Sequence, residues 1–508
     1  MAVICLLGIL CTGCTSEIDK VTRNLQEKGY VKAMSDKNRT EIFNANFLKQ
    51  TEHTNPISGE IFCADPTAVE YNGRLYVFGT NDHQQFDAVG KDGKNTYEKI
   101  QSFVIFSTED MVNWMYHGTI DVKTVAPWII SSWAPSIVSR VEDDGLTHFY
   151  LYFSNNGCGV GVITATDPLG PWSDPLGSPL VYTGMDGIGD CPNPFDPGAC
   201  IDENGVGWLT FGGGTAKNGS SFMPGVTRIV QLGDDMLSFA SGFSEIKAPY
   251  FFEASELNYI NGTYVYTYNN NWESRIEWGI TNADRPGKCS MSYMTTKTPL
   301  DTESWVYRKD YLCNPGEAGF DFSNNHSHLH KFKDSYYLFY HTLSKQKSMS
   351  IEGGFRSLCV SEVFVNEEKL EINKTKPSEA GVIQIQNVIA AAQNQGESFF
   401  AAVGIGFEIN ADGHTTSVKS MEEGAVLCVK GVEFEKDTSH VFSAMVKGRG
   451  RVEVRLDDPQ SESIAAISFE QDSYHGVYDA SVKKTDGVHD VYLVFSDADL
   501  YLDYWQFH

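Results

Sequence analysis

The sequence predicts an all-β protein, in which a five-bladed β-propeller is followed by a β-sandwich. Three observations predict this fold. Short runs of aromatic and apolar residues occur repeatedly between residues 56 and 372, each run directly follows a tight-turn dipeptide, and the turns recur every 57 to 72 residues. Self-similarity on this scale indicates a repeat architecture, and we found no helical pattern of any length between the repeats.

The five turns each lead into a run that is typical of a β-hairpin strand. Asn-Gly and Asp-Gly tolerate the positive φ that tight hairpins need. Five four-stranded blades would take about 63 residues each, a size that suits a propeller. The turns are Asn72-Gly73, Asp144-Gly145, Asn204-Gly205, Asn261-Gly262 and Lys333-Asp334.

Composition divides the 508 residues into four parts. Residues 1–14 read as a signal peptide, 15–55 as a polar tether that leads into the propeller, and 56–372 as the propeller. A linker begins near residue 373, and the alternating strands beyond it, up to residue 508, suit a β-sandwich.

The first residues are typical of a targeting signal rather than of a folded domain. The apolar run over residues 1–13 is too short to span a bilayer. Thr12-Gly13 before Cys14 resembles a bacterial lipoprotein cleavage site, which would make Cys14 the lipidated first residue of a secreted protein held at the cell envelope or surface. No Lys or Arg precedes the run, and an uncleaved apolar tail is the alternative.

The charge and the cysteines exclude several classes of function. A formal net charge of −27 repels phosphate backbones, so we expect no nucleic-acid partner, whereas a neutral polysaccharide is not disfavoured. The 11 cysteines include no Cys-x-x-Cys pair, which excludes zinc ribbons and thioredoxin-type motifs. Cys191 and Cys200 are close enough in sequence to pair, but spacing cannot decide whether they do.

Three acidic residues occupy nearly the same position, relative to the turn, in three of the repeats. Asp65, Asp196 and Glu253 precede the turns of their repeats by 7, 8 and 8 residues. An inverting glycoside hydrolase needs one ionised carboxylate to activate water and one protonated carboxyl to donate to the leaving oxygen, about 6.5–9.5 Å apart. Glu253, next to Phe251 and Phe252, suits the acid, Asp65 suits the base, and Asp196 would help to keep Glu253 protonated. The alternative is that all three are strand-end turn residues.

His326 opens the fifth repeat at the same offset before its turn. A histidine at the floor of the funnel could hold a hydrated cation such as calcium, orient a sugar, or simply pack. His328 and His330 alternate with His326 along a strand, so a zinc site of three histidines is a further alternative, although no fourth ligand is evident.

The ordered motifs resemble glycoside hydrolase family 43, and within it the arabinoxylan arabinofuranohydrolases. They run from Ala64-Asp-Pro-Thr through Ser132-Trp-Ala-Pro, Phe195-Asp-Pro, Phe252-Glu and Asn324-Asn-His to Gly354-Phe-Arg-Ser. The resemblance implies a five-bladed propeller and inverting chemistry without a required cofactor, with Asp65 as general base, Asp196 as pKa modulator and Glu253 as general acid. It also implies a water-bound calcium near His326 and sugar contacts from the residues Trp133, Phe195, Arg356 and Asn81.

The implied activity is release of terminal α-L-arabinofuranosyl groups from arabinoxylan or a related plant-cell-wall polysaccharide. A β-xylosidase or arabinanase on the same fold, and a non-catalytic surface glycan-binding protein, are the alternatives. The oligomeric state stays open.

The C-terminal domain is similar to a family 6 carbohydrate-binding module, most clearly at Val452-Glu-Val-Arg-Leu-Asp and Leu502-Asp-Tyr-Trp. The aromatic residue expected after Gly424-Ala is Val426, which favours weak or no sugar binding. Tyr474 and Tyr478 remain candidate stacking rings, and Trp505 fits the core better.

Overall fold

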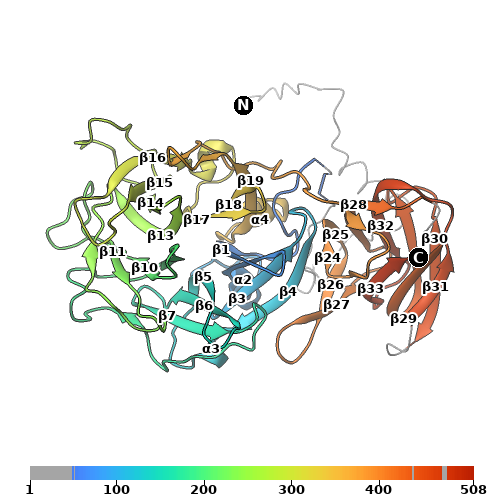
Figure 1. Cartoon of the computed structure of the whole chain (residues 1–508). Helices are drawn as coiled ribbons and strands as arrows, with labels where there is room; N and C mark the ends of the chain where they lie inside the picture. The colour runs from blue at the N-terminus through green and yellow to red at the C-terminus, as the bar shows by residue number, and fades with distance from the viewer. Residues whose placement is uncertain (1–48, 51, 437–439, 472–476) are drawn as a thin grey trace, which may run out of the picture.

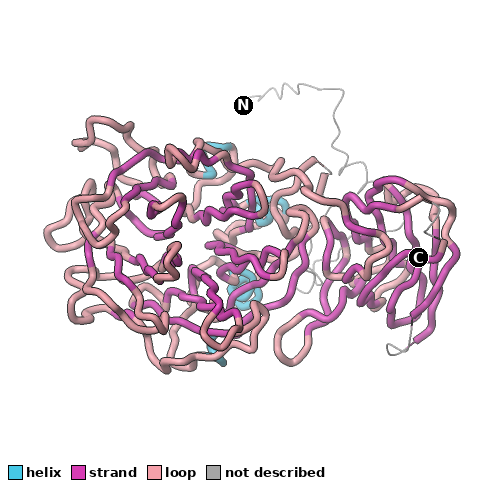
Figure 2. The backbone as a smooth tube through the Cα atoms, viewed as in Figure 1, coloured by secondary structure: helices cyan, strands magenta, loops and turns pink. Residues whose placement is uncertain are grey.

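Hairpins built on the predicted turn dipeptides form five sheets arranged around a common centre, with a second all-β body beside them (Figure 1). This computed structural model describes residues 49–50, 52–436, 440–471 and 477–508. Asn72, Asn261 and Lys333 adopt φ values of 51°, 46° and 51°, and the turn glycines 73, 145, 205 and 262 are also positive. The predicted propeller and sandwich are therefore confirmed, and strands dominate the chain in Figure 2.

Each of the first four blades is an antiparallel sheet of four consecutive strands. The first blade contains β1 (Ala64–Tyr71), β2 (Arg74–Thr80), β3 (Ser102–Thr108) and β4 (Trp114–Asp121). The second contains β5 (Trp133–Val141), β6 (Thr147–Ser154), β7 (Gly159–Ala165) and β8 (Val181–Tyr182). The third contains β9 (Gly198–Ile201), β10 (Gly207–Phe211), β11 (Arg228–Gln231) and β12 (Ser244–Glu245). The fourth contains β13 (Phe251–Ile260), β14 (Thr263–Asn270), β15 (Met291–Thr296) and β16 (Val306–Leu312).

The fifth blade joins the two ends of the propeller segment. It contains β17 (Ser327–Phe332), β18 (Ser335–Thr342) and β19 (Ser357–Val363). In place of a fourth strand, residues 55–57 run beside β19, where Asn55 exchanges two 2.8 Å hydrogen bonds with the backbone of Val360 and Ile57 N–H donates to the Leu358 carbonyl. The chain that enters the propeller thus closes its ring.

Short helices interrupt the blades, which corrects the expectation that none would. Helix α2 (Asp82–Val89) follows β2 directly, and the Asn81 side chain caps it by accepting from the Gln84 N–H at 3.1 Å. Asn is a favoured N-cap because its oxygen satisfies a free amide of the first turn. The others are α3 (Val122–Val125), α4 (Ser344–Ser348) and the 3-10 helix η1 (Pro315–Ala318).

The C-terminal domain is a sandwich of two sheets that share one long strand, β29 (Val441–Leu456). Its first half pairs with β31 (Val477–Ser481) and β33 (Tyr501–Phe507), and its second half with β30 (Ala465–Gln471) and β32 (Gly487–Phe495). Trp505 is fully buried between the sheets, as predicted. The remaining strands after residue 364 are β20 (Val365–Asn366), β21 (Glu371–Ile372), β22 (Val388–Ile389), β23 (Asn394–Gln395), β24 (Ser398–Phe399), β25 (Ala401–Val403), β26 (Ile405–Ile409), β27 (Thr415–Ser420) and β28 (Val426–Phe434).

The sandwich packs against the first blade through a continuous apolar core. Strand β24 pairs with β4 and extends the first blade to five strands. The Tyr116 ring of β4 lies 4.8 Å from the Phe407 ring of the sandwich, centroid to centroid. One buried cluster contains residues of both domains, so the two domains stabilise each other.

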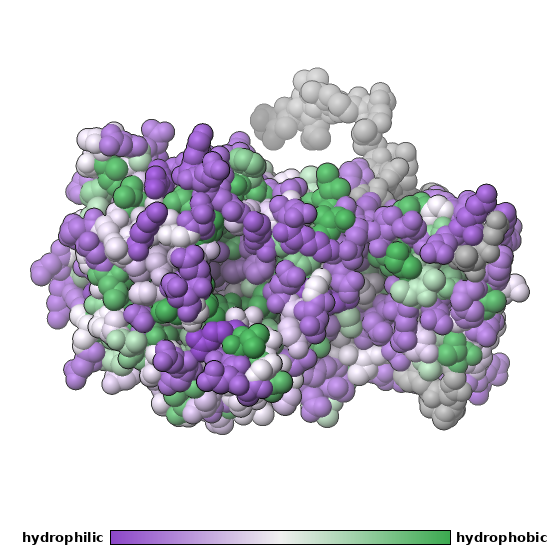
Figure 3. Space-filling view, viewed as in Figure 1, coloured by the Kyte–Doolittle hydropathy of each residue, from purple (hydrophilic) through white to green (hydrophobic). Residues whose placement is uncertain are grey.

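The eight cysteines of the described residues are free thiols, so Cys191 and Cys200 do not form a disulfide. Within the same residues, no helix has the length and apolar character that a membrane span requires. Hydrophilic residues cover most of the face seen in Figure 3, with small apolar patches between them.

Candidate active site

The three acidic residues lie at the start of the innermost strands, where the backbone is irregular. Asp65 and Asp196 have φ values of 48° and 50°, and Ala254, directly after Glu253, has 60°. The pairing of β1 with β2 and of β13 with β14 shifts register at these residues. Such bulges turn a side chain out of the sheet, and non-glycine residues with positive φ concentrate at functional sites. The backbone therefore directs these side chains toward the propeller centre.

One pocket collects these residues, together with others far apart in the sequence. Its cavity volume is about 100 Å³. All three predicted acids and His326 line it, as do the predicted sugar-contacting residues Trp133, Phe195 and Arg356. Two lining residues, Tyr97 and Asn324, were not predicted as sugar contacts.

Asp65 is a buried carboxylate held by positive charge. Its Oδ1 accepts from Arg356 Nη1 at 2.7 Å and lies 3.5 Å from His326 Nδ1. Burial alone would raise the pKa of Asp65, but Arg356 and His326 outweigh it and bring the pKa well below its usual range. Asp65 is therefore ionised at neutral pH.

His341, which the sequence reasoning missed, fixes the backbone beside Asp65. The Asp65 N–H donates to His341 Nδ1 at 3.4 Å, and His341 Nε2 donates to the Asn324 carbonyl at 3.0 Å. Burial, together with the charge of Arg356, lowers the pKa of His341 to about 3, so this ring is neutral. Its position in the apolar and aromatic run that follows the predicted turn Lys333-Asp334 was the one available signal.

The Arg356 guanidinium donates hydrogen bonds to two carboxylates. While Nη1 contacts Asp65, Nε and Nη2 contact the two oxygens of Asp82 at 2.9 and 2.8 Å, and the Arg356 backbone N–H also donates to Asp82. Asp82 is fully buried and also accepts from Asn95 at 2.7 Å. A bidentate contact of this kind fixes the plane of the guanidinium. Asp82 was not among the predicted site residues, although it directly follows Asn81, which was.

Asn81 differs from its predicted role. Its side-chain oxygen caps α2, and its amide nitrogen donates to Ser102 Oγ at 2.9 Å. It does not line the pocket. The cap places Asp82 in the first helical turn, under Arg356. Asn81 thus acts on the pocket through the helix rather than by contact.

Asp196 is tied to the backbone next to Glu253. Its Oδ2 accepts from the Ala254 N–H at 2.8 Å, and its Oδ1 accepts from Ser154 Oγ at 3.1 Å. Burial and the charge of Asp65 raise the pKa of Asp196, while His326 opposes this shift. The carboxyl of Asp196 is therefore both a structural contact and a source of negative potential at Glu253.

Glu253 has the opposite electrostatic setting to Asp65. Burial, followed by the charges of Asp196 and Asp65, raises the pKa of Glu253 to about 8. This carboxyl consequently keeps its proton at neutral pH. The pocket presents one ionised and one protonated carboxyl, which is the combination that acid–base cleavage of a glycosidic bond needs.

His326 lies against the acids, whereas the other two histidines turn to different partners. Burial opposes the charge of His326, but Asp65 and Asp196 outweigh it and raise its pKa. His328 Nδ1 lies 3.1 Å from Glu256 Oε1, and His328 Nε2 lies 3.4 Å from His330 Nδ1. In the described part of the chain, no group of three or more His, Cys, Asp or Glu side chains could hold a metal ion, so the three-histidine zinc site is wrong.

Aromatic rings form part of the pocket wall. The Trp133 indole N–H donates to the Tyr97 carbonyl at 3.0 Å, and the two rings meet edge to face at 6.0 Å. On another side, a Cβ at Gly213 would lie 2.0 Å from the Phe195 ring, so the absence of a side chain there allows Phe195 its position. Such rings suit the CH faces of a sugar.

Comparison with known proteins agrees with this geometry. Residues 52–368 match the model of the glycosyl hydrolases family 43, and residues 395–508 match the carbohydrate binding module (family 6). The chain belongs to glycosyl hydrolase family 43. Members of this family need no cofactor for their chemistry.

Two relatives of this family 43 enzyme cover nearly all of its chain. The arabinoxylan arabinofuranohydrolase of Bacillus subtilis (strain 168) is 31% identical over 93% of this chain and 96% of its own. That of Paenibacillus polymyxa is 30% identical, covering 91% of this chain and 76% of its own.

A solved structure also matches both domains. It is the family 43 arabinoxylan arabinofuranohydrolase from Bacillus subtilis in complex with cellotetraose. It superposes with a TM-score of 0.82 at 30% identity, covering 92% of this chain and 99% of its own.

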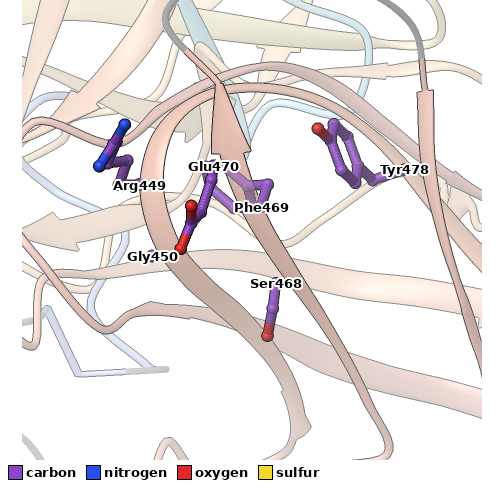
Figure 4. Close-up of a pocket in the computed structure, with 6 residues that line it drawn as sticks. All are labelled: Arg449, Gly450, Ser468, Phe469, Glu470 and Tyr478. Carbon is purple, nitrogen blue, oxygen red and sulfur yellow. The ribbon is translucent and has the colours of Figure 1, made fainter.

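The family 6 domain of this glycoside hydrolase has a hollow of its own (Figure 4). It lies beside β29 where that strand passes from one sheet to the other, and the rings of Phe469 and Tyr478 are 5.9 Å apart there. Tyr478, a predicted stacking residue, thus lines a surface hollow, whereas Tyr474 lies outside the described residues. The other lining residues are Arg449, Gly450, Ser468 and Glu470.

Proposed function

We propose that this protein is an inverting α-L-arabinofuranosidase that releases terminal arabinosyl groups from arabinoxylan. One observation carries the proposal: a single pocket holds a carboxyl with a lowered pKa and a carboxyl with a pKa of about 8. We infer the substrate from the relatives. Two of them bear the name arabinoxylan arabinofuranohydrolase and match over more than nine tenths of this chain.

In this mechanism Asp65 is the general base. Its carboxylate accepts a proton from a water molecule, whose oxygen attacks the anomeric carbon on the face opposite to the leaving group. Glu253 gives its proton to the glycosidic oxygen as the bond to the anomeric carbon breaks. Asp65 ends the cycle protonated and Glu253 ionised, and exchange with solvent resets both.

Asp196 and Arg356 support these two groups. The negative charge of Asp196 favours the protonated form of Glu253, and its bond to the Ala254 N–H fixes the adjacent backbone. Arg356 keeps Asp65 ionised, and its edge in the pocket can donate to a sugar hydroxyl. Trp133 and Phe195 would bound the sugar ring on its apolar faces.

Product analysis tests the activity and separates the alternatives. Arabinoxylan, arabinan and linear xylo-oligosaccharides are incubated with the enzyme, and the anomeric protons are followed by NMR. The proposal expects arabinose from arabinoxylan, with the β-anomer appearing first. Xylose from linear oligosaccharides would support a β-xylosidase instead, and no release from any substrate would leave a glycan-binding protein.

The calcium expected near His326 stays a proposal, in which the ion would be held mainly through water. His326 faces Asp65 at 3.5 Å, and the described residues offer no cluster of ligands around it. We therefore assign no catalytic step to a metal. Titration of the chelator-treated protein with calcium, followed by its melting temperature, tests the site.

The anchor at Cys14 also stays a proposal, because residues 1–48 lie outside the described residues. A lipidated Cys14 would hold the enzyme at the bacterial cell surface, close to polysaccharide outside the cell. Labelling with a fatty-acid probe tests it: the native protein should take up the label, and Cys14→Ser should not.

A further inference from the structure

We propose that Asn95 is a positioning residue of the reaction: it ties the loop over residues 90–101 to the segment that carries Arg356, and so fixes how Arg356 faces the general base, Asp65. This inference rests on the proposed function and extends it to a residue outside the pocket, since Asn95 is not part of the pocket lining.

Asn95 makes four hydrogen bonds through its side-chain amide and its backbone N–H. The amide nitrogen donates to Asp82 Oδ2 at 2.7 Å and to the Gly354 carbonyl at 3.2 Å. The backbone N–H donates to the Gly353 carbonyl at 2.8 Å, and the side-chain oxygen accepts from the Tyr97 N–H at 3.3 Å. One residue therefore joins helix α2, the two glycines and its own loop.

Asp82 Oδ2 is the atom through which Asn95 acts on Arg356. Besides the Asn95 amide, this oxygen accepts from the Arg356 backbone N–H and from Arg356 Nε, each at 2.9 Å. Three donors around one oxygen of a fully buried carboxylate fix the orientation of that carboxylate. Because Arg356 Nη1 contacts Asp65 at 2.7 Å, a rotation of Asp82 would displace the cation that keeps Asp65 ionised.

The two glycines directly before the Phe355-Arg356 pair are held from both sides. Gly353 and Gly354 adopt φ values of 141° and 84°, in the region that glycine alone enters freely. Gln346 Oε1 accepts from the Gly354 N–H and from the next N–H, both at 2.9 Å, while Asn95 binds both glycine carbonyls. These contacts remove the freedom that two glycines would otherwise give to the arginine.

The same loop places Tyr97 over the Arg356 guanidinium. The Tyr97 ring centroid lies 4.9 Å from the guanidinium carbon, and the Tyr97 carbonyl accepts from the Trp133 indole N–H at 3.0 Å. Tyr97 has a φ of 62°, which is strained for a bulky residue and persists only where its surroundings hold it. The bond from the Tyr97 N–H to Asn95 is one of the contacts that do so.

Helix α2 anchors the rest of the loop independently of Asn95. Gln85 Oε1 accepts from the Lys99 N–H at 2.8 Å, and Gln84 Oε1 accepts from the Gln101 N–H at 2.7 Å. The loop should therefore keep its course when Asn95 is replaced. The expected change is confined to the orientation of the residues that Asn95 contacts and of the arginine beyond them.

The pH dependence of kcat/KM on 4-nitrophenyl α-L-arabinofuranoside tests this role. In Asn95→Ala we expect kcat/KM to fall about tenfold at neutral pH. The loss should be larger at acidic pH, because burial raises the pKa of Asp65 and a displaced Arg356 opposes that shift less. Asp65 would then take up a proton, and lose its function as base, at a higher pH than in the native enzyme.

Asn113→Ala is the matched control. Asn113 also donates to a carboxylate and to a backbone carbonyl, those of Asp110 and Lys430, at 2.6 and 2.9 Å, but it joins the first blade to the sandwich. We expect this variant to lower the melting temperature and to keep the native kcat/KM and pH profile. A kinetic loss equal to that of Asn95→Ala would show that general destabilisation is enough, and would overturn the proposal.

Asn95→Asp is a second variant that keeps the shape of the side chain. The introduced carboxyl can donate to Asp82 while it holds a proton, and it repels Asp82 once it is ionised. Relative to the native enzyme, kcat/KM should therefore be highest at acidic pH and fall as the pH rises, which is the opposite trend to that of Asn95→Ala. Trends in the same direction for the two variants would overturn the proposal.

Backbone hydrogen exchange separates this inference from the proposed function. In Asn95→Ala the amides of Tyr97 and Arg356 should exchange faster than in the native protein, whereas in Asn113→Ala they should not. If the native enzyme cleaves no arabinoside, the proposed function fails and the exchange rates still judge the positioning role. Native exchange at both amides, native kinetics of Asn95→Ala, or a kinetic loss of equal size at every pH would overturn it.

Discussion

The pKa of Glu253 depends on a neighbour that can be changed without altering shape. In Asp196→Asn the charge is removed, while the amide oxygen can still accept from the Ala254 N–H and the amide nitrogen can donate to Ser154. For carboxylates on the order of 10 Å apart, with an effective dielectric constant of about 20, the lost repulsion is about 1.7 kcal/mol. That energy corresponds to about 1.2 pH units.

The pH dependence of kcat/KM measures this shift. In the native enzyme activity should fall as the pH rises through about 8, because Glu253 then loses the proton that it must donate. Removing a negative neighbour favours the ionised form, so the alkaline limb of Asp196→Asn should lie about one unit lower. Asp202→Asn serves as control, since Asp202 contacts Trp208 and Tyr264 outside the pocket. An alkaline limb that stays in place or moves upward would refute the electrostatic role of Asp196.

Three further predictions concern residues around the pocket and between the domains. Asp82→Asn should lower kcat/KM by about 100-fold and also lower the melting temperature, because it breaks a buried pair with Arg356; unchanged kinetics would contradict this. Gly213→Ala should lower kcat/KM with an unchanged circular dichroism spectrum, because the new methyl displaces Phe195; native kinetics would contradict it. Phe407→Ala should cost about 2 kcal/mol of stability and split a single calorimetric unfolding transition into two, since it removes an aromatic contact between the domains; one unshifted transition would contradict it.

Most of the fold could be predicted from the sequence, because a hairpin turn depends on a few consecutive residues. Asn72-Gly73 and Asn261-Gly262 need positive φ, and their spacing gave the repeat without any tertiary information. Helix α2 was missed because its eight residues hold no long apolar period, and its start depends on a single capping residue, Asn81. The completion of the fifth blade by residues 55–57 could not be predicted, since it pairs residues some 300 positions apart.

The acids of the site were predictable and their supports were not. Asp65 and Glu253 lie 7 and 8 residues before the turns of their repeats, which is visible in the sequence. Asp82 and His341 act through contacts with Arg356 and the Asp65 backbone, which arise when distant blades meet. Asn81 shows the converse error, because a residue that the family resemblance assigned to the sugar instead caps helix α2.

Varying the leaving group of the substrate tests most directly that Asp65 is the base and Glu253 the acid. The variants Asp65→Asn and Glu253→Gln are assayed on arabinoxylan and on 2,4-dinitrophenyl α-L-arabinofuranoside, whose leaving group departs without a proton. We expect Glu253→Gln to lose nearly all activity on arabinoxylan but to keep most of it on the dinitrophenyl substrate, and we expect Asp65→Asn to be inactive on both. Equal losses for Glu253→Gln on the two substrates, or substantial turnover by Asp65→Asn, would contradict it.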